Sequence, residues 1–275
     1  MNVGIIGGTG KMGRLFAGVF ERAGHDVQVC GRTTPVSCRE LAGKCDLIMV
    51  SVPIRDTVEV IRSIAPQLSP DQVFCDLTSL KIEPVKAMME SAASVIGIHP
   101  MFGPGVPTLR GQTIVVTPAR CTKEILHSLL SIFERDGATI TISTPEEHDR
   151  IMALVQGLTH SVTLIVADTM RRLSVTPEET APFMSPVYQI EMGLVGRLLS
   201  QDPDLYGDML RLNPYVPPVL AACAESLAEL REIVSASDAG GFSDLFGRNA
   251  LHFGSYCDRA AAETDFLIRA MVNRS

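Results

Sequence analysis

The feature that most constrains the fold is a glycine-rich hexapeptide near the N-terminus, Gly8-Thr9-Gly10-Lys11-Met12-Gly13. It follows an apolar run at Val3–Ile6, opens an amphipathic segment at Met12–Ala23, and precedes a β-branched run that ends at Cys30. In this setting a GxGxxG sequence is typical of a dinucleotide-binding unit, because glycine lets the backbone approach a pyrophosphate whose charge meets the helix N-terminus. We expect all six residues to contact the cofactor. The alternative is a glycine-rich turn without a ligand.

The end of the second strand indicates which dinucleotide is bound. An NAD site usually places Asp or Glu there to bond the ribose 2′-hydroxyl, whereas this strand runs into Gly31-Arg32-Thr33-Thr34. The Arg32 guanidinium, with the Thr33 hydroxyl beside it, can pair with a 2′-phosphate. We therefore expect NADP, with NAD less favoured; the alternative is that Arg32 is a solvated loop charge that tolerates either. By topology alone, Ser51-Val52-Pro53 is expected to pass beside the cofactor.

Short β-branched runs alternate with helix-like segments in the first half of the chain, which is typical of a parallel sheet with helices on both faces. The expected strands are Val3–Ile6, Asp26–Cys30, Leu47–Val52, Val73–Asp76, Val95–Ile98, Thr113–Thr117 and Thr139–Ile142. The helices expected between them include Met12–Ala23, Asp56–Ala65, Pro84–Ser91 and Thr122–Asp136. From Pro145 onward the apolar periodicity predicts only helices, at Glu146–Leu173, Ser185–Ser200, Pro203–Leu212, Val216–Ala236 and Asp238–Asn273.

This pattern predicts an α/β fold with two domains. A Rossmann-type, doubly wound parallel sheet is expected at residues 1–146, followed by an all-helical domain at residues 147–275. The predicted helices are too apolar for a lone domain to cover. We therefore expect the second domain to bind substrate and to pair with its copy in a homodimer.

Composition excludes several other classes of protein. The formal net charge of −7 argues against a nucleic-acid partner. The seven cysteines are odd in number and never form a CxxC pair, so neither a disulfide framework nor a metal site is expected. No signal-peptide pattern opens the sequence. The most apolar window, Ile151–Met170, contains polar residues that would be costly in lipid and is interpreted as a buried helix. We expect a cytoplasmic protein with no membrane partner.

Two strand ends carry side chains suited to chemistry, and open α/β sheets bind ligands outside the carboxyl ends of their strands. One strand leads into Asp76-Leu77-Thr78-Ser79-Leu80-Lys81, and the next leads into His99-Pro100-Met101-Phe102-Gly103-Pro104. Together with Gln156–His160 and with the motifs between Ser185 and Tyr206, these residues resemble the prephenate dehydrogenase family, which includes arogenate dehydrogenases. The resemblance covers nearly the whole chain.

The resemblance implies oxidative decarboxylation of prephenate to 4-hydroxyphenylpyruvate, a step of tyrosine biosynthesis, and Arg32 favours NADP as its cofactor. Hydride passes from the ring carbon that bears the hydroxyl to the nicotinamide, and the ring carboxylate leaves as carbon dioxide. His99 matches the family's catalytic histidine, a residue type whose pKa near neutrality suits it to take the hydroxyl proton. Ser79 matches a serine that bonds the same hydroxyl. The alternatives are a histidine that caps its strand and a serine that forms a turn.

Two helices of the second half supply the predicted substrate contacts. Gln156, Thr159 and His160 share one helical stripe, and a buried polar stripe needs partners, of which a bound ligand is one. His160 matches a family histidine at the substrate pocket. Gln189 and Arg197 share a face of the next helix, and Arg197 matches the arginine that holds a substrate carboxylate. An internally bonded stripe and a surface ion pair are the alternatives.

The sequence leaves several alternative interpretations of substrate and function. Gln189 stands where some relatives have another basic residue, so arogenate and 4-amino-4-deoxyprephenate remain alternative substrates. A hydroxyacid dehydrogenase of similar plan would need a helix-borne lysine, but no lysine follows Lys123. A non-enzymatic NADP sensor, the remote alternative, would keep the glycines without needing the catalytic set. His148 is interpreted as a structural residue in the first turn of a helix capped by Thr144.

Overall fold

The computed structural model describes residues 1–273. Within them the chain forms two compact units. The first, the sheet unit, is Met1–Ala153 together with Asp204–Tyr215; the second, the helical unit, is Leu154–Pro203 together with the residues from Val216 onward. The expected domain boundary between residues 146 and 147 remains a prediction.

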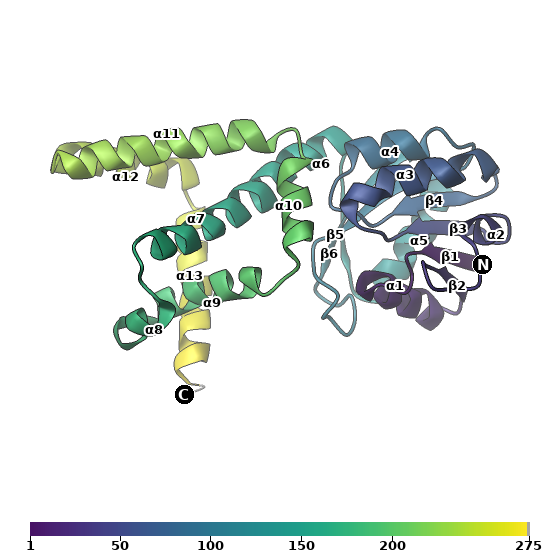
Figure 1. Cartoon of the computed structure of the whole chain (residues 1–275), viewed down its shortest axis with the longest axis horizontal. Coiled ribbons are helices and arrows are strands. Elements are labelled where there is room, and N and C mark those ends of the chain that lie inside the picture. The colour runs from purple at the N-terminus through teal and green to yellow at the C-terminus, as the bar shows by residue number, and fades with distance from the viewer. Residues whose placement is uncertain (274–275) are drawn as a thin grey trace. The chain divides into compact units, whose positions relative to one another are not determined.

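A seven-stranded sheet organises the sheet unit, with the strand order β2-β1-β3-β4-β5-β6-β7 (Figure 1). All seven expected strands are present. Every neighbouring pair is parallel except β5 and β6, which are antiparallel. The expected parallel sheet is therefore wrong at this step, because residues 101–112 form no helical crossover between the two strands. The strands are β1 Asn2–Ile6, β2 Asp26–Cys30, β3 Leu47–Val50, β4 Val73–Asp76, β5 Ser94–Pro100, β6 Thr113–Arg120 and β7 Thr139–Ile142.

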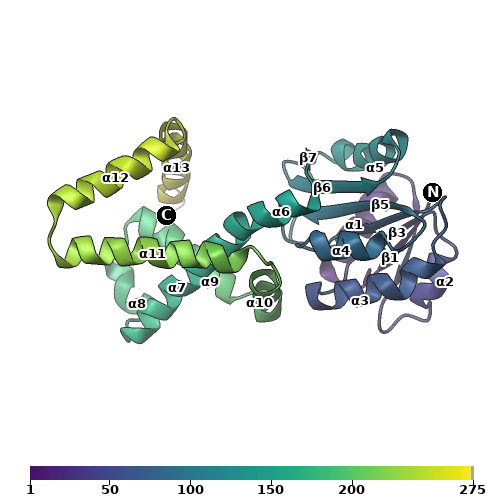
Figure 2. The same ribbon diagram turned by 90° about the horizontal axis from the view of Figure 1, so that it is seen from above.

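Helices cover both faces of this sheet (Figure 2). On one face α1 and α5 contribute Phe16 and Phe133, whose rings meet edge to face with centroids 5.7 Å apart. On the other face, α2, α3 and α4 supply a second buried cluster that includes Ile61 and Met88. The helices of this unit are α1 Lys11–Arg22, α2 Cys38–Ala42, α3 Ile54–Ile64, the 3-10 turn Ala65–Gln67, α4 Ile82–Met88, α5 Lys123–Arg135 and α6 Pro145–Met152. The expected doubly wound architecture is confirmed.

A late segment of the chain returns to the sheet unit. Met209 on α10 (Pro203–Arg211) packs with Ile54 and Leu80 in a small buried cluster. Arg55 Nε donates to Asp208 Oδ2 at 2.8 Å and reinforces this contact. The sheet unit is thus assembled from two stretches that lie far apart in the sequence.

The helical unit contains no strand among its described residues. Two expected helices differ from the structure. Glu146–Leu173 is not a continuous α-helix, because Ala153–Leu158 is a π-helical stretch between α6 and α7. Asp238–Asn273 is two helices, since Gly254 has a φ of 54°, in the left-handed region that glycine favours. The helices are α7 Thr159–Arg172, α8 Pro177–Thr180, the 3-10 turn Ala181–Phe183, α9 Pro186–Leu199, α11 Val216–Ser235, α12 Ala239–Phe253 and α13 Tyr256–Val272.

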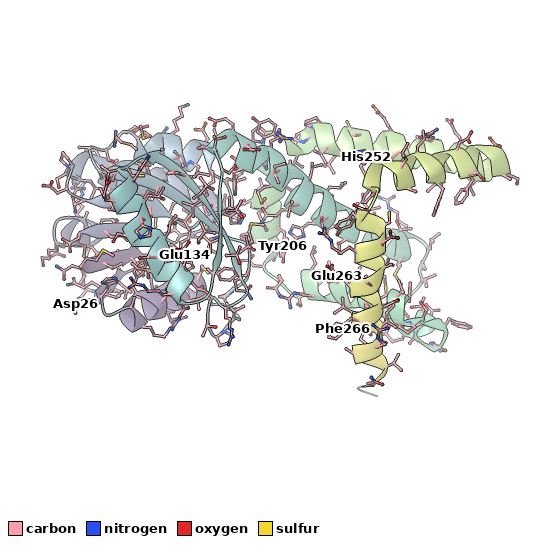
Figure 3. All side chains as sticks on the ribbon, turned by 180° about the vertical axis from the view of Figure 1, so that it is seen from behind. Asp26, Glu134, Tyr206, His252, Glu263 and Phe266 are labelled. Carbon is pink, nitrogen blue, oxygen red and sulfur yellow. The ribbon has the colours of Figure 1, made fainter. Side chains whose placement is uncertain are left out.

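Within this unit very little is buried. Of its described residues only four are buried, namely Gly157, Ser161, Leu198 and Val216. Leu251 is 85% exposed, and Phe266 is 67% exposed. Figure 3 labels Phe266 on α13. The prediction that Ile151–Met170 forms a buried helix is wrong for the single chain, because Ile165 is 46% exposed. A helical unit with this surface lacks a core of its own.

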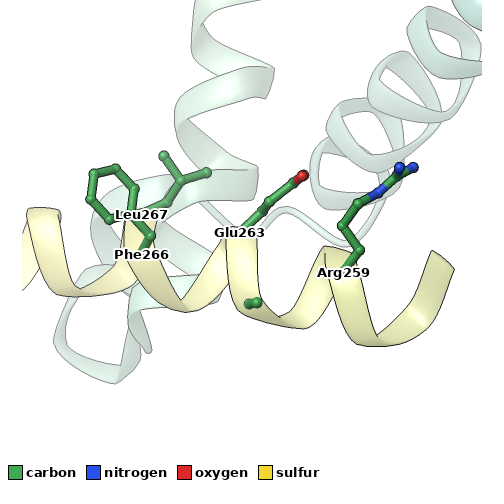
Figure 4. A pocket seen from close by; sticks show the side chains of 5 residues that line it. Arg259, Glu263, Phe266 and Leu267 are labelled. Atoms are coloured by element: carbon green, nitrogen blue, oxygen red, sulfur yellow. The ribbon is translucent and has the colours of Figure 1, made fainter. Parts of the chain in front are cut away.

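Both charged and apolar side chains of α13 line a pocket. Its lining residues all come from this one helix, each three or four residues from another in the set (Figure 4): Arg259, Ala262, Glu263, Phe266 and Leu267. None of them is a predicted site residue.

The stretch Pro145–Arg172 is long and apolar enough, by composition alone, to cross a membrane. Its Gln156, His160 and Asp168 would be costly in lipid. Length and apolarity in this stretch are therefore weak evidence for a membrane span.

Candidate active site

The glycine-rich loop makes a tight connection between β1 and α1. A Cβ at Gly13 would lie 2.6 Å from both the carbonyl oxygen of Gly7 and the Cα of Gly8, so only glycine lets α1 begin so close to the loop. Gly10 is the N-cap of α1, and this helix has neither a side-chain cap nor an acidic residue in its first turn. Its first backbone N–H groups are therefore oriented to donate to an anion. The loop fits the pyrophosphate of a dinucleotide.

The other predicted cofactor residues surround this loop in different ways. Thr9 and Lys11 are exposed, whereas the Met12 side chain packs against the buried core, so only its backbone faces the expected site. Ser51 and Val52 are half-buried at the end of β3, where Ser51 N donates to Ile6 O at 2.7 Å. The remaining residue of this group, Pro53, is the exposed N-cap of α3.

Arg32 and Thr33 are exposed just beyond β2. They lie beside the glycine-rich loop, since a Cβ on Gly31 would meet Thr9 Oγ1 at 2.6 Å. Thr34 is used by the turn itself, because its Oγ1 accepts the Gly31 N–H at 2.9 Å and lies 3.0 Å from Gly31 O. Arg32 and Thr33 are thus exposed side chains beside the glycine-rich loop, and their contact with the cofactor remains a prediction.

The Ser79 loop follows β4 and is anchored from beneath by a buried ion pair. Asp76 Oδ2 accepts the Thr78 N–H at 3.0 Å and also the Lys81 ammonium, and both charged side chains are fully buried. Burial raises the pKa of Asp76 and lowers the pKa of Lys81, and the attraction between the two opposes both shifts. Ser79 itself is half-buried. The ion pair therefore fixes both ends of the loop that presents Ser79.

His99 lies on β5, the strand next to β4, at the same carboxyl edge of the sheet as the Ser79 loop. It is 2% exposed, and its Nδ1 lies 2.8 Å from Nε2 of His148. His148 Nδ1 in turn lies 2.7 Å from Asp149 Oδ1. Asp149 accepts the backbone N–H of Lys81 on Oδ1 at 2.8 Å and that of Ile82 on Oδ2 at 3.0 Å. A hydrogen-bonded chain thus runs from the expected catalytic base to a carboxylate that caps α4.

Burial is the main cause of the electrostatic state of His99. It lowers the pKa of His99 well below the usual value of 6.5, and His148 and Lys81 lower it further. The pKa of His148 is also lowered, by burial first, although Asp149 acts against this shift. Both imidazoles are therefore neutral at physiological pH, which is the state in which His99 accepts a proton.

The predicted substrate residues lie in the helical unit, on the π-helical stretch before α7, on α7 and on α9. The helices α7 and α9 contact each other. Gln156 belongs to the π-helical stretch, a feature frequent at functional sites, and is half-buried. His160 is also half-buried, and burial lowers its pKa. The other three, Thr159, Gln189 and Arg197, are exposed in the single chain.

Comparison with known proteins bears on what these residues do. Residues 22–142 match the prephenate dehydrogenase nucleotide-binding domain, and residues 144–248 match the prephenate dehydrogenase dimerization domain. The T-protein of Haemophilus influenzae is 30% identical over 96% of this chain and 70% of its own length. This chain belongs to the prephenate dehydrogenase family.

Other relatives agree with this membership. A probable arogenate/prephenate dehydrogenase of Methanocaldococcus jannaschii is 34% identical over 99% of this chain, which spans 66% of that relative's length. The structure of prephenate dehydrogenase from A. aeolicus, in complex with hydroxyphenyl propionate and NAD+, shares the fold with a TM-score of 0.72. It is 21% identical and covers 92% of this chain, which covers 96% of that chain.

The family membership confirms the resemblance seen in the sequence and the prediction of an NAD(P)-dependent oxidoreductase. It supports a nicotinamide cofactor and a small-molecule substrate. Across residues 1–273, no group of three or more His, Cys, Asp or Glu side chains is placed to hold a metal ion.

Sequence reasoning missed the residues behind His99. His148 lies in the first turn of α6, as expected, but its ring is also a buried hydrogen-bond partner of His99, which was not expected. The expected cap of α6 is correct, since Thr144 accepts the N–H of Glu147. The contact between His148 and His99 was not predicted because His99, on β5, lies 49 residues earlier in the sequence. Asp76, Lys81 and Asp149 were likewise not recognised as parts of one buried polar network.

Proposed function

We propose that this chain is a prephenate dehydrogenase that uses NADP to convert prephenate to 4-hydroxyphenylpyruvate and carbon dioxide, in tyrosine biosynthesis. The observation that carries the proposal is the buried, neutral His99 at the carboxyl edge of the sheet, next to the Ser79 loop. A neutral imidazole there has the chemistry needed to take the proton of a substrate hydroxyl as the carbonyl forms.

In the proposed reaction a nicotinamide, when bound, would supply the hydride acceptor for the ring carbon that carries the hydroxyl. His99 takes the hydroxyl proton, and Ser79 bonds the same oxygen. The bond between the ring and its carboxylate then breaks, and the electron pair left behind makes the ring aromatic. The phenolic oxygen regains a proton, and His99 is the group in place to return it.

The residues assigned to the substrate support prephenate over arogenate. Arg197 holds a carboxylate through its planar fork, while Gln156, Thr159, His160 and Gln189 offer neutral polar groups. None of these five carries a carboxylate to pair with the side-chain ammonium of arogenate. Gln189 is suited to a keto acid because its amide donates hydrogen bonds to neutral oxygen.

NADP is proposed over NAD because Arg32 and Thr33 occupy the end of β2, where an NAD site usually carries an acidic residue. The glycine-rich loop, with Gly8, Gly10 and Gly13, would hold the pyrophosphate at the N-terminus of α1. Titration of the protein with NADP and with NAD tests this. Tighter binding of NAD would refute the proposed preference.

We further propose a cytoplasmic homodimer that forms through the helical unit. Support comes from its exposed apolar surface and from the matched dimerization domain. We propose that this apolar surface packs against the same unit of a second copy of the chain.

Turnover of purified prephenate, arogenate and 4-amino-4-deoxyprephenate with NADP, followed by the absorbance of the reduced cofactor, tests the reaction. We expect prephenate to give the highest kcat/KM. His99→Asn should lower kcat by about 100-fold or more while NADP still binds, and the exposed His127→Asn serves as the control. Unchanged turnover by His99→Asn would remove His99 from the mechanism. Cofactor binding without turnover of any of the three compounds would favour a sensor.

A further inference from the structure

His99 is hydrogen-bonded to a second histidine. Groups outside the reaction site therefore determine which ring nitrogen of His99 carries the proton. A neutral imidazole carries its proton on only one of two nitrogens, and only the bare nitrogen is a base. Which nitrogen of His99 is bare depends on what its Nδ1 meets. In this structure Nδ1 meets Nε2 of His148 at 2.8 Å.

Asp149, at the other end of this series of hydrogen bonds, determines the tautomers of both histidines. Asp149 receives two backbone N–H groups, those of Lys81 and Ile82, one on each carboxylate oxygen. Backbone N–H groups only donate, so both oxygens act as acceptors, as those of an ionised carboxylate do. The Nδ1 of His148, 2.7 Å from Asp149 Oδ1, must then carry the proton and donate it.

The same logic passes to His99. Because His148 is neutral with its proton on Nδ1, its Nε2 has a free electron pair and can only accept a hydrogen bond. The Nδ1 of His99 must therefore carry the proton that joins the two rings. The remaining nitrogen of His99, Nε2, is left as the proton acceptor.

We infer that His148 and Asp149 are positioning residues that fix His99 in the tautomer with a basic Nε2. The inference rests on the proposed function for its catalytic consequence, but the tautomer itself is a property of the protein alone. When His99 takes a proton on Nε2, its Nδ1–H is already hydrogen-bonded to His148, so the positive charge meets an oriented acceptor.

Surrounding residues hold both His148 and Asp149 in place. His148 and Asp149 are each 2% exposed. The main-chain carbonyl of Asp149 accepts a hydrogen bond of 2.8 Å from Asn213 Nδ2, a side chain that is also buried. Contacts from α4 and from the segment after α10 thus hold the dyad independently of any substrate.

Nitrogen NMR of the imidazoles in isotope-labelled protein tests the tautomer without any substrate. The chain has only six histidines, so single His variants assign each signal. In the wild type we expect both His99 and His148 to be protonated at Nδ1 and bare at Nε2. Protonation of His99 at Nε2 instead would overturn the inference.

Two variants of His148 separate positioning from packing. His148→Leu removes the acceptor and should give His99 a mixture of tautomers, with kcat for prephenate lowered about 10-fold to 100-fold and NADP affinity unchanged. His148→Gln keeps an amide oxygen near the position of Nε2 and should restore most of kcat and the single tautomer. The exposed His127→Leu is the matched control.

These results also separate this inference from the proposed function. A wild-type protein with the expected tautomer but no turnover of any cyclohexadienyl substrate refutes the proposed function and leaves the positioning intact. A His148→Leu protein that keeps both the single tautomer and a kcat within about twofold of wild type refutes the positioning.

Discussion

The ammonium of Lys81 pairs with the carboxylate of Asp76 at a point where both side chains are fully buried, directly behind the loop that presents Ser79. A buried pair of this kind stabilises little in itself, but removal of one partner leaves a charge without compensation. The loop that carries Ser79 therefore depends on both members.

Lys81→Met should destabilise the protein by about 3–5 kcal/mol, since it leaves Asp76 buried without its partner. The double variant Asp76→Asn with Lys81→Met should lose less than the sum of the two single variants, because it removes both charges. Urea unfolding measures each free energy. Lys86→Met on the exposed side of α4 is the control, and equal stability of Lys81→Met and Lys86→Met would contradict this prediction.

Gly13→Ala should weaken NADP binding by at least about tenfold and lower the melting temperature. Its Cβ would lie 2.6 Å from both Gly7 O and Gly8 Cα, so the loop must shift away from the start of α1. Gly18→Ala in the same helix is the control, because its nearest contact is the flexible end of Arg22 at 3.2 Å. Calorimetric titration measures the affinity, and equal affinities in the two variants would count against the loop as the pyrophosphate site.

Arg32→Ser should weaken NADP binding by about tenfold, because one ion pair to the 2′-phosphate is lost. Binding of NAD, which lacks that phosphate, should change by less than about twofold. The ratio of the two dissociation constants is the quantity to compare between the variant and the wild type. Parallel losses for both cofactors would mean that Arg32 contributes to the fold and not to the choice of cofactor.

Stability should decline on the acid side of pH 6.5 because of His99 and His148. Burial lowers the pKa of each in the folded protein from a value of 6.5, so below that pH the unfolded chain binds more protons. The contribution is complete above pH 6.5 and falls by up to about 1.4 kcal/mol per histidine for each pH unit below it.

Melting temperatures measured from about pH 8 down to about pH 5 test this dependence. His99→Asn should show a shallower acid decline than the wild type, and the exposed His127→Asn should behave like the wild type. Identical acid declines in all three proteins would contradict the assignment.

The helical unit should melt at a temperature that depends on protein concentration. Its four buried residues cannot supply a core, so the proposed second copy contributes much of its stability. Melting followed by circular dichroism over about a hundredfold range of concentration should show a rising transition. A monomer by light scattering, with a constant melting temperature, would refute the proposed dimer.

Much of the sheet unit could be predicted from the sequence because its signals are local. Runs such as Val73–Asp76 are strands by residue type, and the glycine-rich loop marks the first crossover. The direction of β6 could not be predicted from its own residues, since it depends on the connection before it. The break at Gly254 was missed because apolar periodicity continues on both sides of it.

Some residues of the site could likewise be predicted from local sequence, whereas others depend on tertiary contacts. His99 and Ser79 follow strands, so a rule about strand ends locates them, and the family resemblance gives them roles. His148 and Asp149 carry no local sign of function, because their partners come from β5 and from the start of α4. Networks of buried polar groups are defined by tertiary contacts, and a single sequence does not contain those distances.

The two carboxylate oxygens of Asp149 accept hydrogen bonds from three donors. Two of the donors are backbone N–H groups at the start of α4, and the third is His148. Selection for heat resistance and selection for faster turnover therefore act on the same atoms at this position. Libraries that vary residue 149 should yield few clones that improve in one property and keep the other. The sheet unit would be easier to stabilise at other positions.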